Sequence, residues 1–203
     1  MTTPTILYLH GFISSPRSAK AQLFARAVAA VPPAARPRLH VPQLPFAPAV
    51  AVAGLAAWIE AELGADAPAA LTIVGSSLGG YYATVLAERF GVRAALINPT
   101  TRPYDDLRPY AGPQENPYTG ERFDVTAASF AELAQMKVAR ITRPERYFLL
   151  QRSGDELLDW REAVACYAGA AQYVAGGGDH GWVDFAAEIP PILRFAGVSV
   201  PTR

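Results

Sequence analysis

The sequence predicts an α/β fold in which a compact, mostly parallel sheet is flanked by helices on both faces. Short apolar segments alternate along the chain with longer amphipathic ones, which is the pattern of strands and helices in turn. The apolar segments are continuous, as expected for strands buried on both faces. With 203 residues and 51% hydrophobic content, the chain can form one domain, residues 1–203, with a substantial core.

The individual elements follow from this alternation. The expected strands are Thr5–Leu9, Arg38–Pro42, Leu71–Gly75, Ala94–Asn98, Arg146–Gln151 and Gln172–Ala175. The expected helices are Pro16–Ala30, Val50–Leu63, Leu78–Phe90, Asp159–Gly169 and Val183–Phe195. In such a sheet a functional site forms at the carboxyl ends of the strands.

Residues 99–144 interrupt the alternation. This segment has no strand-like run, contains five prolines up to Pro117 and is rich in aromatic residues. A helix is expected near Ser129–Val138. Because a long irregular insertion in a compact domain is usually functional, we expect a small folded cap within the domain.

Composition argues against several classes of protein. The formal net charge is zero, so no basic field attracts nucleic acid. The two lysines lie outside any glycine-rich phosphate loop, and no dinucleotide-binding motif follows a strand. The three histidines are scattered and Cys166 is the single cysteine, so we expect no metal, no cofactor and a packed thiol.

The sequence also bears on location. No apolar stretch approaches the roughly 18 residues needed to cross a bilayer. The start, Met1-Thr2-Thr3-Pro4, has no basic region and no cleavage site. A cytoplasmic protein without a membrane partner is expected, and the oligomeric state is left open.

The strongest chemical signal is the G-x-S-x-G motif at Gly75–Gly79, which follows an apolar strand and opens a helix. This strand–elbow–helix is typical of the α/β-hydrolase fold, where a strained turn exposes the central serine as a nucleophile. The alternative is a plain turn. We expect Ser77 to be the nucleophile, above the positive end of the following helix.

A serine hydroxyl needs a base, and in this fold the chain order is serine, acid, histidine. Only His180 follows Ser77, in a glycine-rich loop after the last strand. The acid is expected after the preceding strand, where Asp155 is best placed to accept from the imidazole Nδ1–H. Other carboxylates that remain open as the acid are Glu156, Asp159, Asp105 and Asp106, although Asp159 fits better as the cap of the helix that follows.

The oxyanion hole requires two backbone N–H groups. Leu78 N–H at the helix start is one candidate, and Phe12 N–H in the loop after the first strand is the other. His10 comes too early in the chain for the base and is expected to support that loop. We expect an apolar, aromatic substrate pocket formed by Tyr81, Tyr104, Tyr118 and Trp182.

The whole pattern resembles the YqiA-like esterases. The resemblance rests on Tyr8-Leu9-His10-Gly11-Phe12 with Ser14-Ser15-Pro16, Gly75–Tyr82, Asn98-Pro99, Asn116–Glu121, Gly154–Asp159 and Gly177–His180, in the same order over nearly the whole chain. It implies a cytoplasmic α/β hydrolase that acts on carboxylic esters, with acyl-CoA thioesters as further substrates. It also implies the triad Ser77, Asp155 and His180.

The sequence therefore predicts a serine esterase that hydrolyses small or short-chain carboxylic esters through an acyl-enzyme on Ser77. One alternative is an acyl-CoA thioesterase, with Arg102, Arg108 and Arg122 receiving the nucleotide phosphates. Another is a catalytically silent scaffold that acts as a receptor or interaction module. An intact serine, acid and histidine argues against the scaffold, because binding requires no base.

Overall fold

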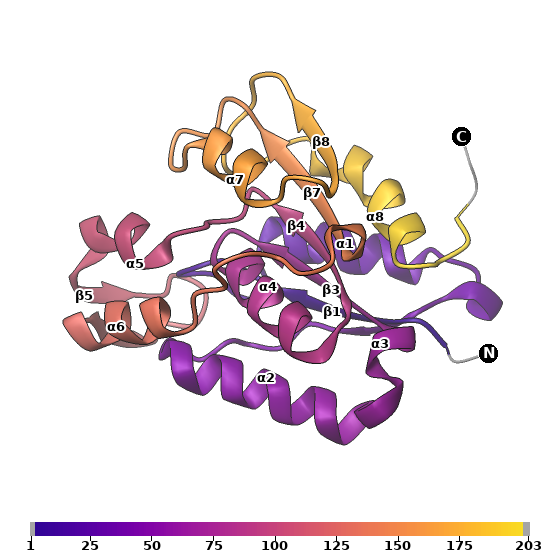
Figure 1. Cartoon of the computed structure of the whole chain (residues 1–203), viewed down its shortest axis with the longest axis horizontal. Coiled ribbons are helices and arrows are strands. Elements are labelled where there is room, and N and C mark those ends of the chain that lie inside the picture. The colour runs from indigo at the N-terminus through magenta and orange to yellow at the C-terminus, as the bar shows by residue number, and fades with distance from the viewer. Residues whose placement is uncertain (1–2, 201–203) are drawn as a thin grey trace.

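Six parallel strands form the main sheet in the computed structural model (Figure 1). Their spatial order is β2-β1-β3-β4-β7-β8. The strands are β1 (Thr5–Leu9), β2 (Arg38–His40), β3 (Leu71–Ser76), β4 (Arg93–Ile97), β7 (Tyr147–Arg152) and β8 (Ala171–Ala175). The structure describes residues 3–200, so Met1, Thr2 and the last three residues of the predicted domain lie outside the described residues.

All six predicted strands are present, with ends that shift by at most two residues. The central strands β1 and β3 are buried along their whole length, which explains their continuous apolar character. β2 lies at one edge, where His40 stacks on Trp58 with ring centroids 4.4 Å apart. The prediction of a parallel sheet is confirmed.

Helices cover both faces of this sheet and form two cores. One core joins the sheet to α2 (Pro48–Glu62), α3 (Ala67–Ala70), α4 (Leu78–Phe90) and α7 (Trp160–Cys166). The other joins the opposite face to α1 (Ala19–Ala29) and α8 (Ile189–Phe195). Figure 1 shows α4 in front of the strands and α1 behind them. The four inner strands β1, β3, β4 and β7 contribute to both cores, since successive side chains point to opposite faces.

Three local predictions need correction. Helix α1 begins at Ala19, because the Ser15 hydroxyl accepts from Arg17 N–H and turns the chain before the helix. The predicted final helix is a 3₁₀ turn, Phe185–Glu188, followed by α8. Cys166 is exposed on α7 and is not packed in the core.

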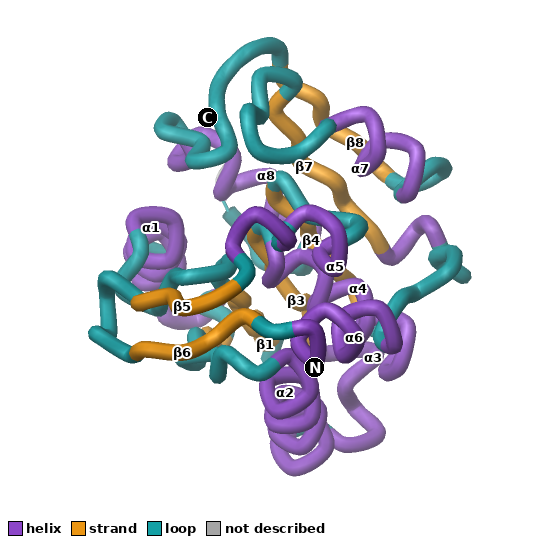
Figure 2. The backbone as a smooth tube through the Cα atoms, turned by 90° about the vertical axis from the view of Figure 1, so that its left-hand side faces the viewer, coloured by secondary structure: helices purple, strands orange, loops and turns teal. Residues whose placement is uncertain are grey.

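The segment 99–144 is more regular than predicted. It contains α5 (Pro103–Asp106), β5 (Gly112–Glu115), β6 (Arg122–Val125) and α6 (Ala127–Gln135). β5 and β6 pair as an antiparallel hairpin, so the expectation of no strand here is wrong. Figure 2 shows this hairpin beside α5 and α6, in front of the main sheet. The division of the chain into one domain with a cap stays a prediction.

Within residues 3–200, no single helix is both long and apolar enough to cross a bilayer. The segments Pro48–Glu62 and Gly64–Ala70 reach that length and hydropathy only as a pair, which is bent by 101°.

Candidate active site

The carboxyl ends of the parallel strands bring the candidate residues to one edge of the sheet. Leu9 pairs with Gly75, Ser76 with Ile97, and Ile97 with Leu150. The loops after β1, β3, β4, β7 and β8 therefore leave the sheet on the same side.

Ser77 occupies a sharp turn between β3 and α4. Its backbone φ of 55° and ψ of −121° lie in a region that residues other than glycine rarely adopt. The turn also requires glycine on each side: a Cβ on Gly75 would lie 2.3 Å from Gly79 O, and one on Gly79 would lie 2.2 Å from Leu9 O. The serine thus stands at the N-terminus of α4, where the helix dipole favours negative charge.

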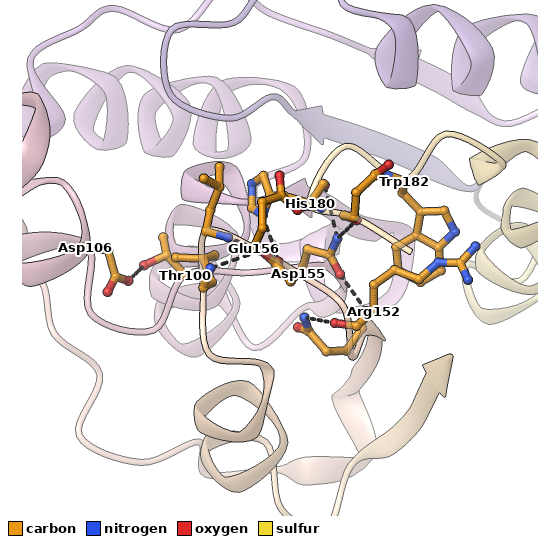
Figure 3. Close-up of polar contacts among 12 residues, drawn as sticks. Thr100, Asp106, Arg152, Asp155, Glu156, His180 and Trp182 are labelled. Atoms are coloured by element: carbon orange, nitrogen blue, oxygen red, sulfur yellow. Dashed lines mark hydrogen bonds and ion pairs between the residues drawn. The ribbon is translucent and has the colours of Figure 1, made fainter. Parts of the chain in front are cut away.

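Asp155 and His180 lie in direct contact. His180 Nδ1 is 2.8 Å from Asp155 Oδ2, and Asp155 Oδ1 accepts from the N–H groups of Leu157 and Leu158, both at 3.0 Å. The Asp155 side chain has no exposed surface, and 15% of the His180 side chain is exposed. Figure 3 shows both groups with Glu156 beside them. With Nδ1–H directed at the carboxylate, Nε2 is free to accept a proton.

The loops that carry the acid and the base also contact each other. Gly154 N–H donates to Gly177 O at 3.0 Å, and a Cβ on Gly154 would lie 2.5 Å from Gly178 O. Glu156 Oε2 accepts from His180 N–H at 2.9 Å, and this bond lowers the pKa of the Glu156 carboxyl. Glu156 therefore holds the main chain of His180, whereas Asp155 contacts its ring.

Ser77 and His180 line one cavity of about 270 Å³. Phe12, Lys20 and Tyr118 contribute to the same cavity, together with Ser14, Ser18, Ser76 and Gly181. A group bound there would have both residues within reach.

Two backbone N–H groups are available beside Ser77. A Cβ on Gly11 would lie 3.1 Å from Ser77 Cβ, so the loop after β1 runs against the nucleophile. Within the described part of the chain, neither Phe12 N–H nor Leu78 N–H has a hydrogen-bond acceptor. Unpaired N–H groups at such a position are suited to receive a developing oxyanion.

The loop after β1 is held from two sides. The Phe12 ring packs against Phe46, Tyr110 and Phe123. Asn116 at the tip of the β5–β6 hairpin donates from Nδ2 to Ser14 O at 2.9 Å. Residues 99–144 therefore help to fix the backbone beside Ser77.

His10 supports the same region from below, as its sequence position suggests. It is buried, and its Nε2 accepts from Leu44 N–H at 3.2 Å. Burial lowers the pKa of this imidazole, which keeps it a neutral acceptor.

Lys20 extends from α1 into the cavity and donates from Nζ to His180 O at 3.0 Å. Burial lowers the pKa of its ammonium group from 10.5 to about 8, against the attraction of Asp155, Asp179 and Glu156. The sequence singled out this residue only as one of two lysines.

Of the four aromatic residues predicted to bind substrate, the structure brings only Tyr118 to the cavity. Tyr81 is buried and donates to Leu133 O at 2.6 Å, and Tyr104 packs against the core beneath Lys137. Trp182 is 1% exposed and stacks on the Arg152 guanidinium, as Figure 3 shows. These three side chains have a structural role, because their rings pack against other parts of the protein and do not line the cavity.

Sequence reasoning also passed over Asn98, which it noted only within an Asn-Pro pair. Asn98 directly follows β4 and is fully buried, and its side chain bonds to the end of β7 and to the loop after β8. A polar residue at the carboxyl end of a central strand was the available signal.

Four non-glycine residues in the described chain have positive φ: Ile13, Ser77, Asn98 and Trp182. They lie in four different loops at the same edge of the sheet.

Asp159 accepts from Arg161 N–H and caps α7, so its predicted role is confirmed. Among residues 3–200, no three His, Cys, Asp or Glu side chains gather where they could hold a metal ion.

Comparison with known proteins identifies the family. Residues 5–197 match a family described as "Uncharacterised protein family (UPF0227)". The chain belongs to this family. It is the YqiA-like family that the sequence resembles.

Solved structures of α/β hydrolases share the fold of this chain. A candidate hydrolase from Agrobacterium vitis S4 is 18% identical, with a TM-score of 0.71, over 96% of this chain and 88% of that one. Mouse alpha/beta hydrolase domain-containing protein 10 is 17% identical, with a TM-score of 0.67, over 96% of this chain and 90% of that one. Est1E from Butyrivibrio proteoclasticus, solved with ferulic acid, is 11% identical, with a TM-score of 0.66, over 95% of this chain and 87% of that one. At these identities the likeness establishes the fold.

Proposed function

We propose that this chain is a serine esterase that hydrolyses small or short-chain carboxylic esters, with Ser77, Asp155 and His180 as its triad. The observation that carries the proposal is the shared cavity: Ser77 in a strained elbow and His180, whose Nδ1 is 2.8 Å from Asp155, line the same space. Acyl transfer needs this set of groups, whereas ligand binding alone does not.

In the proposed reaction, His180 Nε2 accepts the hydroxyl proton as Ser77 Oγ forms a bond to the ester carbonyl carbon. The carbonyl oxygen becomes an oxyanion that accepts from Leu78 N–H and Phe12 N–H. As the ester C–O bond breaks, His180 returns the proton to the departing alkoxide. Water then gives a proton to His180 and bonds to the acyl carbon. As the bond from that carbon to Ser77 Oγ breaks, His180 returns the proton to Oγ, which releases the acid product and restores the hydroxyl.

The preference for short acyl groups rests on the space around the oxyanion donors. Phe12 and Leu78 also line a hollow of about 30 Å³, together with Phe46, Tyr82 and Phe123. The cavity at Ser77 is about 270 Å³, and part of its lining is hydroxyl groups. A long acyl chain would have to displace packed aromatic rings, which is costly in a close-packed interior.

The thioesterase alternative receives less support. It needs a cationic site for nucleotide phosphates, but Arg102, Arg108 and Arg122 each pair with a carboxylate and none lines the cavity. The two activities can be compared directly by measuring kcat/KM for an acyl-CoA and for an aryl ester of the same acyl length.

The test is a chain-length panel of chromogenic aryl esters on the wild type and on Ser77→Ala. Acetyl and butyryl esters should give the highest kcat/KM, octanoyl esters should be poor, and Ser77→Ala should lose roughly 10⁴- to 10⁶-fold. Ser199→Ala, a change of an exposed serine outside the cavity, is the matched control and should keep full activity.

A fluorophosphonate probe tests the silent-scaffold alternative on the same proteins. The wild type and Ser199→Ala should be labelled and Ser77→Ala should not. A folded wild type that neither takes the label nor hydrolyses any ester would overturn the proposal and favour a receptor.

A further inference from the structure

The main-chain carbonyl of His180 accepts hydrogen bonds from two side chains that lie far away in the sequence. Asn98 donates from Nδ2 at 3.1 Å, and Lys20 donates from Nζ at 3.0 Å. Asn98 Nδ2 also lies 3.3 Å from Asp179 O. The peptide that carries the imidazole is therefore bonded both to the end of β4 and to α1.

Asn98 connects this peptide to the strand that leads to the acid. Its Oδ1 accepts from Arg152 N–H at 2.8 Å, and its own N–H donates to Leu150 O at 2.9 Å. One amide side chain therefore spans the end of β7 and the loop of His180. The residue is completely buried and holds a φ of 41°, which asparagine tolerates better than most side chains.

The loop itself cannot fix the imidazole. Residues 176–178 are three consecutive glycines that are exposed, and Gly177 and Gly178 have positive φ. Such a segment has many accessible conformations, so the direction of His180 depends on bonds from outside the loop. The N–H of His180 donates to Glu156, and its Nδ1 contacts Asp155. Its carbonyl accepts from Asn98 and Lys20. Among the described residues, only Nε2 of His180 has no protein partner.

We propose that Asn98 is a positioning residue of this active site, and that Asn98 and Lys20 together hold the His180 carbonyl so that Nε2 faces Ser77. The proposal rests on the proposed esterase function. Asn98 is not part of the cavity lining, so it acts through His180 and does not touch substrate. Because a displacement of about 1 Å at a reacting group can cost about 100-fold in rate, losing these bonds should lower kcat.

The principal test is Asn98→Gly, because glycine adopts the required positive φ without strain while removing the amide. We expect kcat for a short-chain ester to fall about 10- to 100-fold, with KM changed less than about 3-fold. The rate of fluorophosphonate labelling at Ser77 should fall in parallel, because labelling also needs the base. A folded Asn98→Gly protein with wild-type kcat and labelling rate would overturn the proposal.

Lys20→Met tests the second bond, and Lys137→Met, which changes the only other lysine, is its matched control. Lys20→Met should lower kcat and Lys137→Met should not. Because both donors act on one carbonyl, the double variant with Asn98→Gly should lose less than the product of the two single losses. Losses that multiply fully would mean that the two residues do not share this task. Should Asn98→Gly not fold, a wild-type kcat in Lys20→Met would overturn the proposal by itself.

The same measurements separate this proposal from the function on which it rests. A wild type without Ser77-dependent ester hydrolysis removes the esterase assignment. A wild type that is active and Ser77-dependent, with a normal Asn98→Gly variant, removes only the positioning role.

Discussion

Glu156 Oε2 accepts a hydrogen bond from the main-chain N–H of His180 at 2.9 Å, directly beside the carboxylate that contacts the ring of the same histidine. Two neighbouring acidic residues therefore hold one histidine in different ways. Asp155 is placed to stabilise an imidazolium ion, while Glu156 restrains the loop. This difference can be measured.

Asp155→Asn should lower kcat by roughly 10⁴-fold, because an amide at this position favours the wrong imidazole tautomer. Glu156→Gln is the matched isosteric change and should cost less than about 10-fold, since the glutamine oxygen still accepts from His180 N–H. Steady-state kinetics on one short-chain ester compares the two. Equal losses would indicate that Glu156 shares the role of the acid.

Gly79→Ala should prevent stable folding or cost at least about 3 kcal/mol, because its Cβ would overlap the carbonyl oxygens of Leu9 and His10 at 2.2 and 2.6 Å. Gly54→Ala on the exposed side of α2 meets nothing within 4 Å and should stabilise the protein by about 0.5–1 kcal/mol. Urea denaturation measures both. A Gly79→Ala protein as stable as wild type would contradict the close approach of α4 to β1.

Lys20 should make the free energy of unfolding rise with pH in the alkaline range. Its pKa is about 8 in the folded protein and near 10.5 in the unfolded chain, so between these values the unfolded state binds the additional proton and stability rises with pH. Lys20→Met lacks this contribution. The difference in unfolding free energy, wild type minus Lys20→Met, should therefore increase between pH 7.5 and 9.5.

Urea denaturation at several pH values gives that difference. Burial raises the pKa of Tyr8, Tyr82 and Tyr167, which lowers stability near pH 10, but these residues are present in both proteins and their contribution cancels in the difference. A difference that stays constant would show that the ammonium group is well solvated.

Asn116→Ala should lower kcat/KM about 10-fold, because Ser14 O loses its donor and the loop with Phe12 N–H becomes less ordered. Thr119→Ala, on the exposed tip of the same hairpin, is the control and should have little effect. Ester kinetics should be accompanied by a melting curve, so that a general loss of stability is recognised. An unchanged kcat/KM in Asn116→Ala would mean that the aromatic contacts of Phe12 suffice to hold the loop.

The main sheet was predictable because its strands are buried on both faces and leave continuous apolar segments. The β5–β6 hairpin was not, since Gly112–Glu115 and Arg122–Val125 contain proline and charged residues and have largely exposed side chains. Short strands at the surface have no apolar period that distinguishes them from a loop.

The candidate triad was predictable from chain order, because the fold dictates where a nucleophile, an acid and a base can arise. The pocket was not. Aromatic side chains serve the core as readily as a cavity, and Tyr81 and Trp182 are buried. Lys20 bonds to a main-chain carbonyl group, which exists at every position and leaves no sequence pattern, whereas Asn98 had only its position at the end of a central strand as a signal.

The strained backbone positions have a consequence for evolution and design. Ile13, Ser77, Asn98 and Trp182 all hold unfavourable conformations at one edge of the molecule, where the two hydrophobic cores must compensate for them. At position 77, glycine would relieve this strain but would remove the hydroxyl that we propose as the nucleophile. Selection for thermal resistance alone would therefore oppose selection for activity at this residue.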